Sequence, residues 1–132
     1  MLILIGKSKY TRPTVQCRSL IFTNIKSSSA RVAWTKGNGS YTIILVSISS
    51  IPANPLTDGK IYTSSTVYTS APLVNGCRCM YVSTSNVVNI SGLAKKTLYY
   101  VKAFSYNRLT AAVSYIYLQQ DGINNPSYFT TS

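Results

Sequence analysis

The 132-residue chain contains no histidine and no glutamate, and its two acidic residues are Asp58 and Asp121. General acid–base catalysis usually depends on histidine or a carboxylate, and glycoside hydrolysis requires two carboxylates that flank the scissile bond. A serine or cysteine nucleophile activated by histidine is excluded, because no histidine is present. The composition therefore argues against an enzyme, and we predict no catalytic residue.

Metal ligands are also scarce. Zinc sites use four cysteine or histidine ligands, or three together with a water molecule, and hard cations require several carboxylates. Besides its two aspartates, the chain offers Cys17, Cys77 and Cys79. We therefore predict no metal site and no cofactor. The three cysteines are interpreted as reduced, small side chains, with a disulfide or a metal-binding use as the alternative.

Long hydrophobic runs are missing as well. The first apolar run extends from Leu2 to Ile5 and is followed by Gly6 and Lys7, whereas a secretory signal has positive charge first and then about 7–15 apolar residues. No segment approaches the roughly 18 apolar residues of a membrane span. We expect neither a signal peptide nor a membrane span. We also expect the protein to fold in a reducing cytoplasm.

The residues that are present favour β structure. Hydrophobic residues make up 45% of the chain, which argues against disorder even though charged residues make up only 11%. Val, Ile and Thr together number 36, and there are 11 Tyr; these residues suit half-buried strands better than helices. Apolar–polar alternations separated by turn residues predict strands over 19–25, 30–36, 41–48, 79–82, 87–90, 97–106, 113–118 and 128–131.

Residues 49–80 interrupt this series. Three prolines and an Asp-Gly pair break the segment, and only two short β candidates remain, at 61–63 and 67–68. The segment is therefore predicted to be a long, irregular insertion in the middle of the chain.

Two short motifs stand out among the predicted strands. Trp34 lies in the predicted second strand, within ARVAWT, and Leu93 precedes Tyr99 by six residues in GLAKKTLYYVKAFSYN. These features resemble the core tryptophan and the tyrosine corner of the fibronectin type III family. Lys95 and Lys96 stand where the family usually has a Pro-Gly turn, which adds charge at that end of the domain.

Two further features resemble a bacterial or bacteriophage variant of the family. They are WTKGNGS with a long insertion that ends near Gly76, and SYN at 105–107 followed by NPSYFTT at 125–131. The resemblance implies an all-β fold: a fibronectin type III or Ig-like antiparallel β-sandwich of about seven strands, with a long mid-chain insertion. It covers residues 13–132 as a single domain, preceded by a basic arm at 1–12.

The aromatic residues divide into two groups. Trp34 and Tyr99 fall on the apolar phase of their strands, and with Leu93 they are predicted to lie in the core. A second group is predicted to form a contact patch on an outer sheet face, since tyrosine is enriched at contact surfaces. Its members are Tyr100, Tyr106, Tyr115 and Tyr117. The alternative for this group is the ordinary preference of tyrosine for strands.

Positive charge dominates the chain, with 13 Lys and Arg against two acids and a formal net charge of +11. The electrostatic field of so many cations favours a negatively charged partner. The alternative is that the charge serves only to keep the protein soluble. Seven cations within the first 36 residues are the predicted partner-binding residues: Lys7, Lys9, Arg12, Arg18, Lys26, Arg31 and Lys36.

The leading hypothesis from the sequence is a non-enzymatic structural or binding module. Because sandwiches of this family often occur on bacteriophage virions, the resemblance implies a virion accessory or decoration protein, made in the host cytoplasm and docked on an acidic capsid or tail protein. One alternative is a module of a bacterial cell-surface or secreted carbohydrate-associated protein. Another is a non-specific nucleic-acid binder, although no recognisable nucleic-acid-binding motif is present. Assembly with further copies of the chain is left open.

Overall fold

The computed structural model describes residues 11–109 and 114–132, so Lys7 and Lys9 lie outside the described residues. Within these ranges the chain forms nine strands and one short 3-10 helix, η2 (Tyr68–Ser70). The strands are β1 (Arg18–Thr23), β2 (Ala30–Thr35), β3 (Tyr41–Ser47), β4 (Leu73–Val74), β5 (Cys77–Ser83), β6 (Val87–Ile90), β7 (Leu98–Leu109), β8 (Ser114–Tyr117) and β9 (Ser127–Thr130).

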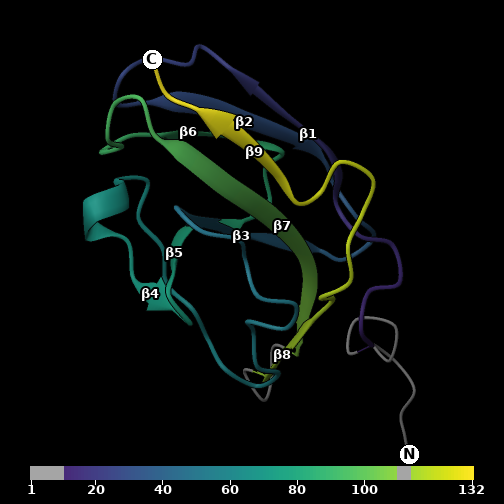
Figure 1. Ribbon diagram of the computed structural model, residues 1–132. Helices are drawn as coiled ribbons and strands as arrows, with labels where there is room; N and C mark the ends of the chain where they lie inside the picture. Colours follow the sequence, from purple (N-terminus) through teal and green to yellow (C-terminus); the bar gives the residue numbers. More distant parts are fainter. Residues whose placement is uncertain (1–10, 110–113) are drawn as a thin grey trace, which may run out of the picture.

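The strands form two antiparallel sheets. Sheet A has the order β1-β2-β6, and sheet B has the order β4-β5-β3-β7-β8, with β9 also paired to β7. Figure 1 shows β1, β2 and β6 in one layer and β3, β5 and β7 in the other. The predicted all-β antiparallel sandwich is confirmed.

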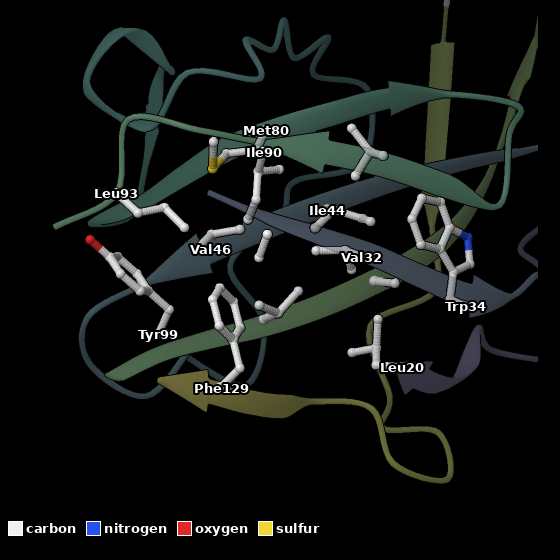
Figure 2. Close-up of a cluster of buried hydrophobic side chains, with 14 of the residues drawn as sticks. Leu20, Val32, Trp34, Ile44, Val46, Met80, Ile90, Leu93, Tyr99 and Phe129 are labelled. Carbon is white, nitrogen blue, oxygen red and sulfur yellow. The ribbon is translucent and has the colours of Figure 1, made fainter. Parts of the chain in front are cut away.

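The main core lies between the two sheets. Strand β2 shows why it forms there: Ala30, Val32 and Trp34 are buried while the residues between them are more exposed, as the period of two requires. Figure 2 shows the side chains that meet in this core, among them Leu20, Val32, Trp34, Ile44, Val46, Met80, Ile90, Leu93, Tyr99 and Phe129.

Tyr99 lies in the core and also holds the connection before its strand. Its hydroxyl accepts a hydrogen bond of 2.7 Å from the backbone N–H of Ala94. Between them Lys96 adopts a positive φ of 50°, so a lysine takes the left-handed position at which such a turn favours glycine. Leu93, from the same connection, packs in the same core, so the predicted tyrosine corner forms without its usual Pro-Gly.

The opposite face of sheet B is also buried, a feature that the sequence pattern had not predicted. The mid-chain insertion crosses this face, and its Leu56 and Tyr62 pack in a second cluster with Leu45, Phe104 and Tyr106 of sheet B. Strand β3 therefore lies between two apolar layers, and its last six residues are all buried. This two-sided burial explains why Tyr41–Ser47 reads as a nearly continuous apolar run instead of an alternation.

Three local expectations for the insertion and its surroundings are wrong. Residues 61–63 form no strand, and Tyr68 begins the 3-10 helix η2 after a single bridge at Val67. Strand β5 begins at Cys77, two residues earlier than predicted. Strand β7 continues to Leu109, because β8 supplies partners for its last four residues.

The last strand of the sandwich is split into β8 and β9, which pair with different parts of β7. In the gap, side-chain amides replace a partner strand. Asn125 accepts the N–H of Ala103 at 2.9 Å and donates to its carbonyl at 2.7 Å. Gln16 accepts the N–H of Ser105 at 2.7 Å and donates to the carbonyl of Leu118 at 2.8 Å. A primary amide carries both a donor and an acceptor, so it can stand in for a peptide group here.

The variant Gln16→Ala tests whether the Gln16 amide takes the place of a partner strand beside β7. The variant leaves buried backbone groups of Ser105 and Leu118 without these partners, so we expect the free energy of unfolding to fall by about 3 kcal/mol. Urea denaturation monitored by circular dichroism measures the change. The matched control is Gln120→Ala, which removes an exposed side chain and should change stability by less than about 0.5 kcal/mol. Equal stabilities for the two variants would contradict the role given to Gln16.

Candidate docking surface

Both acidic side chains are engaged in internal ion pairs. Asp58, in the insertion, accepts two hydrogen bonds from the Arg12 guanidinium, at 2.6 and 3.1 Å. Asp58 also accepts the N–H of Tyr117 at 3.0 Å, and Arg12 donates to the carbonyl of the same residue at 2.6 Å. The hydrogen bond from Arg12 holds the pKa of the Asp58 carboxyl below its usual value.

The second pair buries a lysine. Lys102 projects from β7 with its side chain only 3% exposed, and its ammonium lies 2.8 Å from Asp121 and 2.7 Å from the carbonyl of Gln119. The ammonium also lies 4.9 Å from the centre of the Phe104 ring. Burying a charge costs free energy unless the charge is paired, and Asp121 supplies the paired carboxylate for Lys102.

The pairing changes the role expected for Arg12. It was predicted to bind a partner, and the structure places it instead in a bidentate bridge between the start of the domain and the insertion. Four other predicted cations remain exposed, and we call them the cationic face: Arg18, Lys26, Arg31 and Lys36. None of the four forms an ion pair among the described residues, because both acids are already engaged.

The cationic face occupies sheet A and its connections. Arg18 of β1 pairs with Thr35 of β2, so it lies beside Lys36 at one end of the hairpin. Arg31 of β2 pairs with Thr23 at the other end, where the connection that contains Lys26 begins. The only side-chain hydrogen bond described for the set is the 3.0 Å bond from Lys36 to the carbonyl of Thr84.

An apolar strip separates the two ends of the cationic face. Ala33 pairs with Ile21 on one side and with Val87 on the other. Ile21 is 57% exposed. The outer surface of sheet A therefore has a small apolar centre between two cationic ends, an arrangement similar to the apolar core and polar rim of protein interfaces.

A hollow of about 300 Å³ lies at the Arg31 end of this surface. Its polar lining consists of Asn24, Lys26, Ser29, Arg31, Asn89 and Ser91. Arg31 and Asn89 are directly opposite each other across β2 and β6. The lining offers hydrogen-bond donors and positive charge and contains no acid.

Two lysines that were not predicted as partner-binding residues lie at the same end of the sandwich. Lys96 donates its backbone N–H to the carbonyl of Ser132 at 3.2 Å, and Ser132 donates in turn to the carbonyl of Lys26 at 3.1 Å. Lys95 and Lys96 are exposed, and neither forms a side-chain hydrogen bond or ion pair among the residues the structure describes. The replacement of the usual Pro-Gly turn by two lysines was the sequence signal for this charge.

The predicted exposed tyrosine patch is wrong for three of its four members. Tyr106, Tyr115 and Tyr117 are 2%, 8% and 1% exposed, and their rings contact one another in the cluster beneath the insertion. Burial raises the pKa values of Tyr106 and Tyr117 above the usual value. Tyr100 is half-buried.

One exposed tyrosine was missed. Tyr128 is 64% exposed and lies 6.1 Å from Tyr100, ring centre to ring centre, across β7 and β9. The two rings line a second hollow of about 230 Å³ together with Ser50, Ile51, Pro126 and Ser127. The position of Tyr128 in the last strand of the sandwich, shortly after Pro126, did not indicate that its side chain would face solvent.

The cysteines offer no reactive thiol. All three are buried and free, and burial raises the pKa of Cys79 to about 12 and also raises the pKa of Cys17. A thiol nucleophile or metal ligand requires the opposite shift. In the described ranges, no group of three or more metal-ligating residues gathers, and no helix is long and apolar enough to cross a membrane.

Comparisons with known proteins identify the fold. No family model and no curated protein sequence matches the chain. Among solved structures, domains A168–A170 of titin match with a TM-score of 0.52 and 11% identity, over 90% of this chain and 32% of that one. The chain thus spans about a third of the titin segment.

Single fibronectin type III domains match as well. The FN5 domain of Drosophila Lar matches with a TM-score of 0.43 and 16% identity, over 83% of this chain and 98% of that one. An FN3 domain of human collagen XX matches with a TM-score of 0.40 and 20% identity, over 71% of this chain and 73% of that one. The chain has a fibronectin type III-like fold, an antiparallel sandwich of the Ig-like class.

The Arg12–Asp58 pair predicts how stability depends on pH. The pKa of Asp58 is lower in the folded state than in the unfolded state. The pair therefore stabilises the fold fully at any pH above the pKa that Asp58 has in the unfolded chain. This contribution is lost as the pH falls through the lower pKa that Asp58 has in the folded protein. We expect the free energy of unfolding to decrease between about pH 5 and pH 2, and Asp58→Asn to flatten this dependence. Urea denaturation across the pH range measures it. An unchanged slope in Asp58→Asn would rule out the pair as its source.

Proposed function

We propose that the protein is a non-enzymatic binding module that docks through its cationic face on an acidic protein surface. The observation that carries this proposal is the engagement of both acids, Asp58 and Asp121, in internal pairs. Since no described carboxylate forms an ion pair with Arg18, Lys26, Arg31 or Lys36, their charge is left for a partner. Complementary potentials of this kind steer association and fix orientation.

The two faces of the sandwich support the choice of surface. The insertion covers the outer face of sheet B and buries apolar side chains there, whereas the outer face of sheet A carries exposed Arg31 and Ile21 with no further layer of described residues above them. Sheet A is therefore the face on which a second protein can lie flat. The exposed apolar strip would contribute burial and the cations orientation.

We propose further that the partner is a capsid or tail protein of a bacteriophage, which makes the chain a virion accessory or decoration protein. This step rests on the analogy with sandwiches of this fold on virion surfaces and on the strongly basic composition. Imaging of the native assembly that co-purifies with the chain tests it. The idea fails if no virion component is bound at moderate salt.

A second candidate is a module associated with carbohydrate. The hollow beside Tyr100 and Tyr128 favours it, since two accessible aromatic rings with neighbouring hydroxyls can stack against sugar rings. Tyr128→Ala should then abolish retardation of the protein in native gels that contain a soluble polysaccharide. The nucleic-acid alternative has less support, because sheet A exposes no large aromatic side chain among the described residues to stack on a base.

A titration of labelled protein with polyglutamate tests the docking function. At about 50 mM salt we expect amide shifts on β1, β2 and β6 and in the connections around Lys26 and Lys36, and no shifts in the insertion. Raising the salt to about 300 mM should weaken binding, because screening lengths shorten below 10 Å. Shifts confined to the insertion, or no binding at low salt, would contradict the proposed function.

A further inference from the structure

We infer that the hollow at the Arg31 end of sheet A is a specific site for a carboxylate side chain of the acidic partner. This assignment rests on the docking function proposed above and names the place where that function would be most selective. The hollow holds about 300 Å³, enough for one or two carboxylate groups, and lies where β1 and β6 end and β2 begins.

The backbone builds the hollow in a defined way. The chain leaves β1 through Asn24, whose φ of 49° lies in the left-handed region that asparagine tolerates. The connection then tightens, with the N–H of Lys26 donating to the carbonyl of Ser29 at 2.9 Å. The N–H of Leu93 donates to the carbonyl of Ser28 at 3.0 Å, which ties this connection to the end of β6. The connection that lines the hollow is thus held by a backbone hydrogen bond of its own and by one from the residues that follow β6.

The charges of the hollow have no partner within the described chain. Lys26 and Arg31 both line it, and neither side chain forms an ion pair or hydrogen bond with a described residue. Two cations that face one hollow repel each other, and a bound anion would remove that repulsion. The hollow therefore favours an anion more strongly than an isolated surface lysine would.

The donors suit a planar oxyanion. The guanidinium of Arg31 can donate two parallel hydrogen bonds to one carboxylate, and Lys26 adds a compact positive charge. Asn89, directly opposite Arg31 in the sheet, and Asn24 add neutral amide donors. A nucleic-acid phosphate would bring bases beside it, and the apolar residues that line the hollow are Ala30 and Ile90, which offer no ring for stacking. The aliphatic part of a glutamate side chain fits such neighbours better.

Fluorescence anisotropy with a labelled hexaglutamate peptide tests the site. We expect Lys26→Gln/Arg31→Gln to weaken binding at least about tenfold, the order expected from losing two charge-assisted contacts. The matched control is Lys60→Gln/Arg108→Gln, which removes the same net charge from side chains that lie against Tyr62 and Tyr41 on the sheet B side. The control should weaken binding no more than about twofold. All four side chains are exposed, and thermal denaturation verifies that both variants stay folded.

The outcomes separate the site from the docking function. If Lys26→Gln/Arg31→Gln weakens the peptide no more than Arg18→Gln/Lys36→Gln at the other end of the cationic face, while both weaken it more than the control, the docking function stands and the specific site is overturned. If the control weakens the peptide as much as Lys26→Gln/Arg31→Gln, binding follows net charge alone, and docking through sheet A is overturned as well. If the unaltered protein binds no hexaglutamate even at low salt, both fail. If a thymidine decanucleotide binds as tightly as the peptide and with the same sensitivity to Lys26→Gln/Arg31→Gln, the assignment to a carboxylate is overturned in favour of phosphate.

Discussion

Burial of sheet B on both faces is the constraint on which the rest of the structure depends. A two-layer sandwich ordinarily leaves the outer face of each sheet to solvent, and alternating strands result. Here the insertion adds a third, irregular layer over β3, β5 and β7, so these strands carry apolar side chains toward both neighbours. The insertion is held by its own hydrogen bonds, including a reciprocal pair between Leu56 and the Gln119 amide at 2.9 and 2.7 Å.

The placement of the two acids follows from this third layer. Asp58 belongs to the insertion and joins it to Arg12 and to Tyr117 at the end of β8. Asp121 belongs to the connection between β8 and β9 and neutralises Lys102, whose side chain lies on the same covered face. Both carboxylates therefore stabilise the sheet B side of the molecule. The cations of sheet A and its connections are therefore left without an acidic partner among the described residues.

The sequence predicted the parts of the fold that depend on local pattern. Alternation placed most strands within a few residues, and the positions of Trp34, Leu93 and Tyr99 indicated the core between the sheets. The buried state of Tyr106 and Tyr117 was missed, although the nearly continuous apolar run at 41–48 was a signal of two-sided burial. A strand that is apolar on both phases requires a cover on each face, and the insertion was the segment long enough to supply it.

The candidate site was predictable only in part, for a physical reason. Four exposed cations could be named from the sequence, since they lie in or beside strands that alternation identifies. The removal of Arg12 from that set could not, because its partner Asp58 is 46 residues away and meets it only after the insertion has packed. Gln16 and Asn125 were missed for the same reason: an isolated amide gives no pattern until the fold places it opposite an unpaired strand.

Mass mapping of tyrosine nitration tests the central claim that the insertion closes the outer face of sheet B. In the folded protein we expect Tyr128 to be nitrated before the other tyrosines that the structure describes, since its side chain is 64% exposed, and Tyr106 and Tyr117 to be protected until the protein unfolds. Nitration of Tyr106 or Tyr117 at a rate similar to that of Tyr128 would show that this face is open. The exclusive assignment of docking to sheet A would then be contradicted.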